Sequence, residues 1–177
     1  LYRYSAEVNN ISMSLLITRA IQEQSGGGLG LRGGHARNNP QGPLFYNIYN
    51  IGANRSDQDG IDFAASRNWD TREKAILYGS KYLMNNYITK GQDSLYLQKF
   101  DVHNKNPGHH YYMSNIRAPY SEAKNMLRGY ISNYMDHVKR ILEIPLYTNM
   151  PVYNAYPISL DINYSGTIMK DPYSEYQ

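Results

Sequence analysis

The chain has 177 residues, a length that suits one domain with a full hydrophobic core. Its 18 Lys and Arg against 15 Asp and Glu give a formal net charge of +3. Without a dense basic block we expect no nucleic-acid binding, although an anionic polymer would suit this charge. The absence of cysteine excludes disulfide scaffolds and thiol nucleophiles, and no apolar run approaches the length of a membrane-spanning helix.

The first predicted helix runs from Ser12 to Gln24. Ser12 can accept hydrogen bonds from the free amides of the first turn, and the glycine cluster that follows ends the helix. Glu23 comes seven positions after Leu16 and three after Ala20. At helical spacing it therefore shares their inward-facing edge.

Glu23 is the candidate general acid. Partial burial disfavours the charged form of a carboxyl group and raises its pKa, which a proton donor that works near neutral pH requires. The alternative is a glutamate at the end of its helix that turns outward into solvent.

Residues 25–45 are too rich in Gly and Pro for a helix. We expect a long loop or a short hairpin over a cleft. A phosphate-binding loop is poorly supported, because the segment lacks the Gly-Lys-Ser/Thr ending and follows a helix instead of a strand.

Four further helices are predicted, over residues 57–66, 70–87, 93–100 and 121–142. Ala123 and Leu127 of the last one are assigned to the core. Beyond Glu143 several prolines favour extended structure. We divide the chain into a domain of residues 1–150 and a C-terminal extension, 151–177, that packs on the domain or leaves it.

Side chains suited to sugars are abundant. The chain has 19 Tyr against 3 Phe and 1 Trp, and a tyrosine ring can stack on a sugar while its hydroxyl forms hydrogen bonds. In the segment Phe45–Ala53, Asn47 and Asn50 offer the donors and acceptors that match an N-acetylated sugar. A purely structural turn is the alternative for this segment.

Two other kinds of site find little support. His109 and His110 are adjacent, so their side chains diverge, and no His-Glu-x-x-His helix is present. We therefore predict no metal site and no cofactor. No serine lies in a Gly-x-Ser-x-Gly turn, so a Ser-His-Asp triad is not predicted either.

Acidic residues are absent from position 24 through position 56. Glycoside hydrolysis ordinarily uses two carboxyl groups, and the second could come only from later residues, namely Asp57, Asp59, Asp62 or others such as Asp101. Where the substrate carries a 2-acetamido group, its own carbonyl oxygen can replace the second carboxylate.

Five segments carry a resemblance to a known family. They are, in order, Glu23 at the end of Ile-Gln-Glu-Gln, Tyr46–Ala53, Trp69 before Thr-Arg-Glu-Lys-Ala-Ile, Gly91–Phe100 and Tyr111–Tyr120. From about residue 8 to 150 the chain resembles the catalytic domain of an endo-β-N-acetylglucosaminidase of glycoside hydrolase family 73, as found in bacterial autolysins.

The resemblance implies a mainly α, lysozyme-like domain with a catalytic glutamate at a helix end, facing a groove for peptidoglycan glycan strands. It implies that Glu23 is the general acid and that Tyr112 is a second catalytic residue. The implied substrate-binding residues are Tyr46, Asn47, Tyr49, Asn50 and Tyr120. Many members carry another acid in the lobe after the first Glu, and residues 25–56 of this chain have none. The identity of the base therefore stays open.

The expected activity is hydrolysis of the β-1,4 bond between N-acetylglucosamine and N-acetylmuramic acid by a secreted, cell-wall-associated monomer. A muramidase or a lytic transglycosylase acting on the same glycan is the nearest alternative, because the same fold and a single Glu would serve both. A non-catalytic wall-binding module and a structural helical domain are alternatives from other classes.

Overall fold

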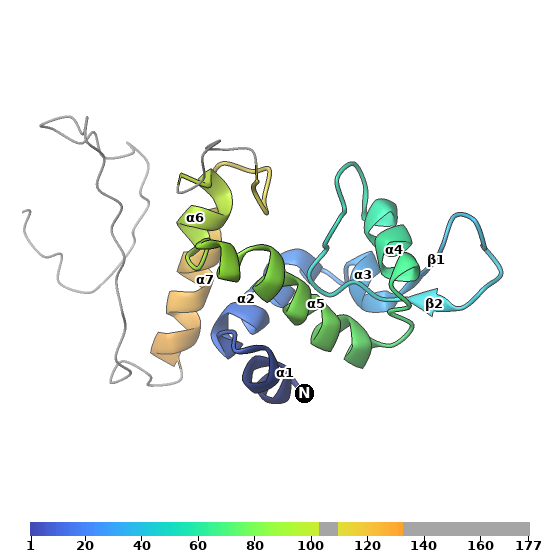
Figure 1. Cartoon of the computed structure of the whole chain (residues 1–177), viewed down its shortest axis with the longest axis horizontal. Helices are drawn as coiled ribbons and strands as arrows, with labels where there is room; N and C mark the ends of the chain where they lie inside the picture. The colour runs from blue at the N-terminus through green and yellow to red at the C-terminus, as the bar shows by residue number, and fades with distance from the viewer. Residues whose placement is uncertain (103–109, 133–177) are drawn as a thin grey trace, which may run out of the picture. The chain divides into compact units, whose positions relative to one another are not determined.

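A computed structural model describes residues 1–102 and 110–132, which belong to one compact unit (Figure 1). The elements are α1 (Tyr2–Asn9), α2 (Met13–Gln24), α3 (Leu29–Arg32), β1 (Gly34–His35), β2 (Leu44–Phe45), α4 (Asp57–Ser66), α5 (Arg72–Asn86), the 3-10 helix η1 (Ile88–Lys90), α6 (Leu95–Phe100) and α7 (Ala118–Ser132). The predicted boundary at residue 150 and the predicted extension lie outside the described residues.

Side-chain caps fix where several helices begin. The Ser12 hydroxyl accepts from the amide of Leu15, as predicted, and the Thr71 hydroxyl accepts from the amide of Lys74 at the start of α5. Ser56 and Ser94 cap α4 and α6 in the same way. Such caps contribute about 1 kcal/mol each.

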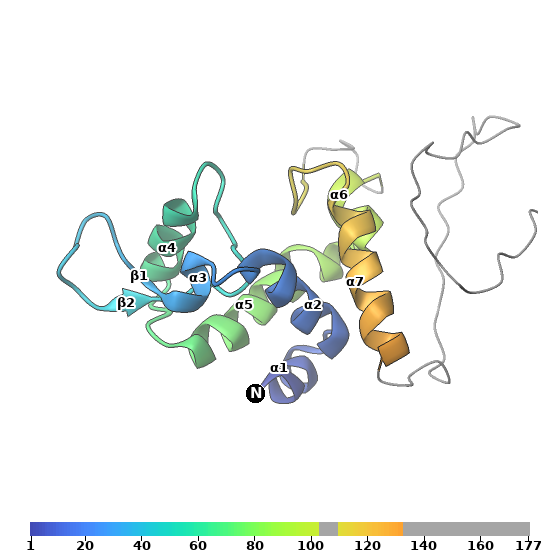
Figure 2. The same ribbon diagram turned by 180° about the vertical axis from the view of Figure 1, so that it is seen from behind.

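The core forms where α2, α5 and the segment before α4 meet, with α1 and α7 packed beside α2 (Figures 1 and 2). Its buried members are Ile11, Leu15, Leu16, Ala20, Ile48, Tyr49, Ile51, Ala64, Trp69, Ala75, Ile76 and Leu83. Gly79 allows a close contact within this core, because a Cβ there would lie 2.7 Å from Cδ2 of Tyr49. The Tyr49 ring can therefore pack directly against α5.

Two helices differ from the sequence-based expectation. The helix α1 was not predicted from the sequence, and α7 begins at Ala118, three residues earlier than expected. The assignment of Ala123 and Leu127 to the core was wrong, because Ala123 is exposed and the Leu127 side chain is 46% exposed. The inner face of α7 carries Glu122 and Met126 instead.

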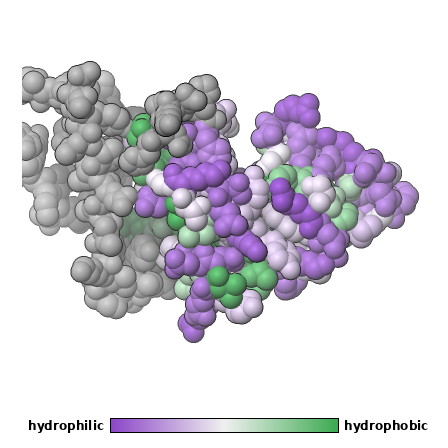
Figure 3. Space-filling view, in the orientation of Figure 1, coloured by the Kyte–Doolittle hydropathy of each residue, from purple (hydrophilic) through white to green (hydrophobic). Residues whose placement is uncertain are grey.

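The Gly-rich segment contains more structure than a loop. It forms the short helix α3, although its composition argued against a helix, and then the antiparallel β1–β2 hairpin, in which Gly34 pairs with Phe45. The surface over this hairpin and α4 is mainly hydrophilic (Figure 3). In residues 1–102 and 110–132, no helix has the length and apolar character that crossing a membrane requires.

Candidate active site

A cavity of about 630 Å³ lies beside Glu23, between the end of α2, the chain after Tyr49 and the start of α7. Its size is typical of sites for small ligands. Tyrosines, amide side chains and carboxyl groups dominate the wall, among them Tyr49, Tyr82, Tyr87, Tyr111, Tyr112, Asn50, Asn54, Asn115, Glu23, Asp59 and Glu122. No described residue of the β1–β2 hairpin lines it.

Glu23 is half-buried in this cavity, in the last turn of α2. Burial is the largest influence and raises the pKa of its carboxyl group. The positive charge of Arg19 and a side-chain hydrogen bond with Asn50 lower this pKa in part. The carboxyl therefore holds its proton to a higher pH than an exposed glutamate does, which is the property of a general acid.

Arg19 lies one turn before Glu23 and is fully buried. Its Nε donates to Oε1 of Glu122 over 2.8 Å and its Nη2 donates to Oε2 over 3.1 Å, so that α2 and α7 are joined by a bidentate ion pair. The guanidinium carbon also lies 4.1 Å from the centre of the Tyr112 ring. Arg19 thus contacts both the carboxylate of Glu122 and the ring of Tyr112.

The Tyr112 hydroxyl donates to the backbone carbonyl of Tyr49. Its ring packs edge-to-face against Tyr87, with 5.3 Å between the ring centres. Burial raises the pKa of the Tyr112 phenol well above its ordinary value, so the hydroxyl keeps its proton at neutral pH. Because that proton is engaged with Tyr49, the free lone pairs of the oxygen can only accept a hydrogen bond, for instance from water.

Asn50 reaches Glu23 because the chain turns sharply at this point. Its φ is +53°, in the left-handed region that asparagine tolerates better than most residues. Asn47 stabilises the turn: its amide nitrogen donates to the carbonyls of Ile51 and Gly60, and its oxygen accepts from the amide of Ile51. Asn47 is fully buried, so it holds the turn from inside and does not line the cavity.

Two of the predicted sugar-binding tyrosines also lie outside this cavity. Tyr46 packs beside Arg72, whose guanidinium carbon is 5.1 Å from the ring centre. Tyr120 is 48% exposed on α7 and lies two positions from both Ala118 and Glu122, which line the cavity. At 100° per residue it points to the opposite side of the helix. The structure brings Glu23, Tyr49, Asn50 and Tyr112 together, but not Tyr46, Asn47 or Tyr120.

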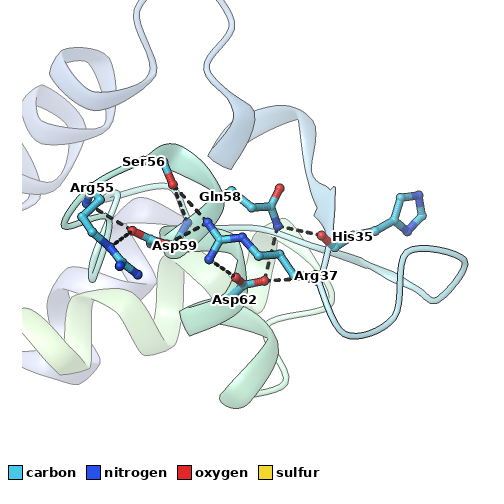
Figure 4. Close-up of polar contacts among 7 residues, drawn as sticks. All are labelled: His35, Arg37, Arg55, Ser56, Gln58, Asp59 and Asp62. Atoms are coloured by element: carbon cyan, nitrogen blue, oxygen red, sulfur yellow. Dashed lines mark hydrogen bonds and ion pairs between the residues drawn. The ribbon is translucent and has the colours of Figure 1, made fainter.

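Asp59 is a further carboxylate on the cavity wall, but arginines hold it (Figure 4). Arg37 Nη2 lies 2.7 Å from Oδ1 of Asp59, and Arg55 Nε lies 3.3 Å from Oδ2. The hydrogen bond from Arg37 is the main reason that the pKa of Asp59 is lowered. Asp62 pairs with the same Arg37 over 3.0 Å and does not line the cavity.

The other acidic and histidine candidates among the described residues do not line this cavity. Asp57 is exposed, and Asp101 is buried and accepts from the amide of His110. The His110 ring stacks on Tyr87, and His109 lies outside the described residues. Within those residues, no group of three or more His, Asp or Glu is arranged to hold a metal ion.

Sequence reasoning missed Arg19, Glu122, Tyr87 and Tyr111. For Arg19 a signal was present, because a charged residue four positions before Glu23 shares its face of the helix. Glu122 gave none, since its partner lies 103 positions away in the sequence. Tyr111, 50% exposed beside Tyr112, lay within a segment that the resemblance already named.

No protein-family model matches the chain. It is 29% identical over 153 residues to the bifunctional autolysin of Staphylococcus aureus, an alignment that covers 82% of this chain and 12% of the relative's length. The chain thus corresponds to a small part of that protein.

Solved structures show the same likeness. A catalytic mutant of S. aureus Autolysin E, with alanine in place of a glutamate and in complex with the disaccharide NAG-NAM, is 27% identical at a TM-score of 0.64, over 75% of this chain and 59% of that one. Autolysin E was also solved with the muropeptide NAM-L-Ala-D-iGlu. S. aureus glucosaminidase B is 26% identical at a TM-score of 0.56, over 73% of this chain and 51% of that one. The predicted resemblance and the mainly α, lysozyme-like fold are confirmed.

Proposed function

Because this chain is a homologue of the staphylococcal autolysins and glucosaminidases, we propose that it hydrolyses the glycan backbone of peptidoglycan. The bond cleaved is the β-1,4 linkage that follows N-acetylglucosamine, which makes the chain the catalytic domain of an endo-β-N-acetylglucosaminidase. Two relatives support this assignment: one carries that activity in its name, and the other was solved with NAG-NAM.

The half-buried carboxyl of Glu23, facing a cavity of tyrosines and asparagines, carries the proposal. Glu23 donates its proton to the glycosidic oxygen as the bond from that oxygen to the anomeric carbon breaks. Autolysin E supports this role, since the residue replaced in its catalytic mutant is also a glutamate. One well-placed general acid contributes roughly 10²- to 10⁴-fold in rate.

The second catalytic group is best supplied by the substrate. The other carboxyl groups on the wall, Asp59 and Glu122, are both engaged: two arginines hold the oxygens of Asp59, and Glu122 is paired with Arg19. The 2-acetamido oxygen of N-acetylglucosamine can instead bond to the anomeric carbon as the leaving group departs. Water then opens this intermediate and returns a proton to the Glu23 carboxylate. The Tyr112 oxygen is available to accept a hydrogen bond from that water.

Substitution of Glu23 tests the proposal on purified wall sacks. Glu23→Gln keeps the shape of the side chain but has no proton to donate, so release of soluble fragments should fall at least about 10²-fold. Glu7→Gln on α1 is the matched control, because it removes an exposed carboxyl outside the cavity. Circular dichroism and wall binding should be unchanged in both variants, and full turnover by Glu23→Gln would refute the assignment.

Mass spectrometry of borohydride-reduced fragments identifies the bond that is cut. N-acetylglucosamine at the new reducing end supports a glucosaminidase, whereas N-acetylmuramic acid indicates a muramidase and a 1,6-anhydro product a lytic transglycosylase. Wall binding without any fragment release by the wild-type chain would indicate a non-catalytic module.

The binding partner that this function implies is the glycan strand of peptidoglycan. We propose that the chain acts as a secreted monomer at the cell wall, as its autolysin relatives suggest. Sedimentation of the purified chain with and without wall fragments measures both its oligomeric state and its association with the wall.

A further inference from the structure

A second cavity, of about 570 Å³, lies next to the one that contains Glu23. Tyr82 lines both, so the two cavities meet at this side chain. The outer wall is one face of α5, where Tyr78, Lys81, Tyr82 and Asn85 follow at spacings of three and four residues. The other wall comes from the end of α4 and the connection to α5, with Arg67 and Trp69.

Two aromatic residues of its wall, Trp69 and Tyr82, pack on Phe63, which lines the Glu23 cavity instead. Phe63 meets Trp69 edge-to-face with 5.6 Å between ring centres, and meets Tyr82 with 5.4 Å. The guanidinium carbon of Arg67 lies 4.6 Å from the Phe63 ring centre and 5.3 Å from that of Tyr82. Stacking on two rings holds the Arg67 side chain in place and leaves the edge of its planar group free to donate.

The charge of this cavity is positive and uncompensated. Arg67 and Lys81 are exposed, and neither forms an ion pair within residues 1–102 and 110–132. No Asp or Glu is among the described residues of its wall, which offers the amide groups of Asn85 and Asn86 instead. Cations beside amides and aromatic rings match a ligand that carries carboxylates and peptide bonds.

We propose that this second cavity binds the acidic stem peptide of the substrate. The inference rests on the proposed function, because the peptide is attached to the muramic acid residue of the same glycan. With a muramic acid in the Glu23 cavity, its peptide has only to pass Tyr82. An extended peptide advances about 3.3 Å per residue, so the two residues from muramic acid to isoglutamate span roughly 7 Å. The isoglutamate carboxylate is then paired with Arg67 and Lys81.

Turnover of two substrates tests the inference. Intact glycan strands are compared with strands whose peptides an amidase has removed, and the ratio of kcat/KM on the two is measured. In the double variant Arg67→Gln, Lys81→Gln this ratio should fall about tenfold, the effect of losing two solvent-exposed charge contacts. Lys90→Gln, which removes an exposed cation of η1 outside both cavities, should keep the wild-type ratio. An unchanged ratio in the double variant would overturn the inference.

Binding of a soluble muropeptide provides a readout that needs no turnover. The wild-type chain is titrated with NAM-L-Ala-D-iGlu, and then with its isoglutamine analogue, in which a carboxamide replaces the α-carboxylate while the γ-carboxylate is kept. Weaker binding of the analogue, together with loss of that difference in Lys81→Gln, supports the site. Equal affinities for both ligands would overturn it, whereas a failure of the proposed function would appear as absence of turnover on both strands.

Discussion

Two sets of arginine–carboxylate contacts lie on either side of the Glu23 cavity, and they differ mainly in their exposure to water. The Arg19–Glu122 pair joins α2 to α7, and its side chains are 0% and 2% exposed. The network of Arg37 with Asp59 and Asp62 joins the hairpin to α4, and Arg37 is 51% exposed (Figure 4). The shortest N–O distances are nearly equal, 2.8 Å and 2.7 Å.

Burial decides what these similar geometries contribute. Water screens the charges of the exposed network, and holding its arginine in one geometry costs side-chain entropy. Pairs of this kind therefore contribute about 0–1 kcal/mol to the stability of the fold. The buried pair has lost its hydration, and each partner depends on the other for compensation of its charge. Distance alone therefore does not rank ion pairs, and the two sets should respond very differently to substitution.

The largest effect is expected from Glu122→Ala. The variant leaves the Arg19 guanidinium buried without its partner, which should destabilise the fold by about 3–5 kcal/mol in urea unfolding. It should also lower activity, because Arg19 contacts Tyr112 and lies beside Glu23. Glu73→Ala, an exposed glutamate in the first turn of α5, is the matched control and should change stability by less than about 1 kcal/mol.

A double variant shows whether the unpaired charge is the cause. Arg19→Met combined with Glu122→Leu removes both charges, and should be more stable than Glu122→Ala alone. A double variant as unstable as the single one would mean that the loss comes from packing and not from the uncompensated arginine.

An intermediate effect is expected from Glu23→Gln, measured as stability against pH. Because the pKa of Glu23 is raised in the folded state, ionising it above its unfolded value of 4.5 costs stability. At pH 7 the variant should therefore melt at a higher temperature than the wild type. Below the unfolded pKa both forms are neutral, and the difference should vanish. An equal advantage at pH 3 and pH 7 would contradict this account.

Local sequence patterns predicted the parts of this site that depend on neighbouring residues. The helix that carries Glu23 in its last turn follows from its Ser12 cap, its apolar spacing and the glycines after it, and the turn that presents Asn50 lies within one short segment. The same patterns do not show which polar side chain of such a turn points inward. Asn50 reaches the cavity, whereas Asn47 is buried and bonded to Ile51 and Gly60.

Contacts between distant segments could not be predicted in the same way. Arg19 and Glu122 become partners only when α7 packs on α2, and that packing decides which face of α7 is turned inward. In this packing Ala118 and Glu122 line the cavity, whereas Tyr120, two positions from each, points away from it. The junction of the two cavities at Tyr82 likewise forms only in the folded chain.

The smallest effect is expected from Arg37→Ala, which breaks the exposed network. The variant should lose less than about 1 kcal/mol, and the loss should shrink further in 0.5 M salt because exposed charges are screened. Arg55→Ala removes the other partner of Asp59 and should likewise lose less than about 1 kcal/mol. Urea unfolding at low and high salt measures both. A salt-independent loss as large as that of Glu122→Ala would show that Arg37 carries a structural role that its exposure does not reveal, and that burial is not what separates the two sets.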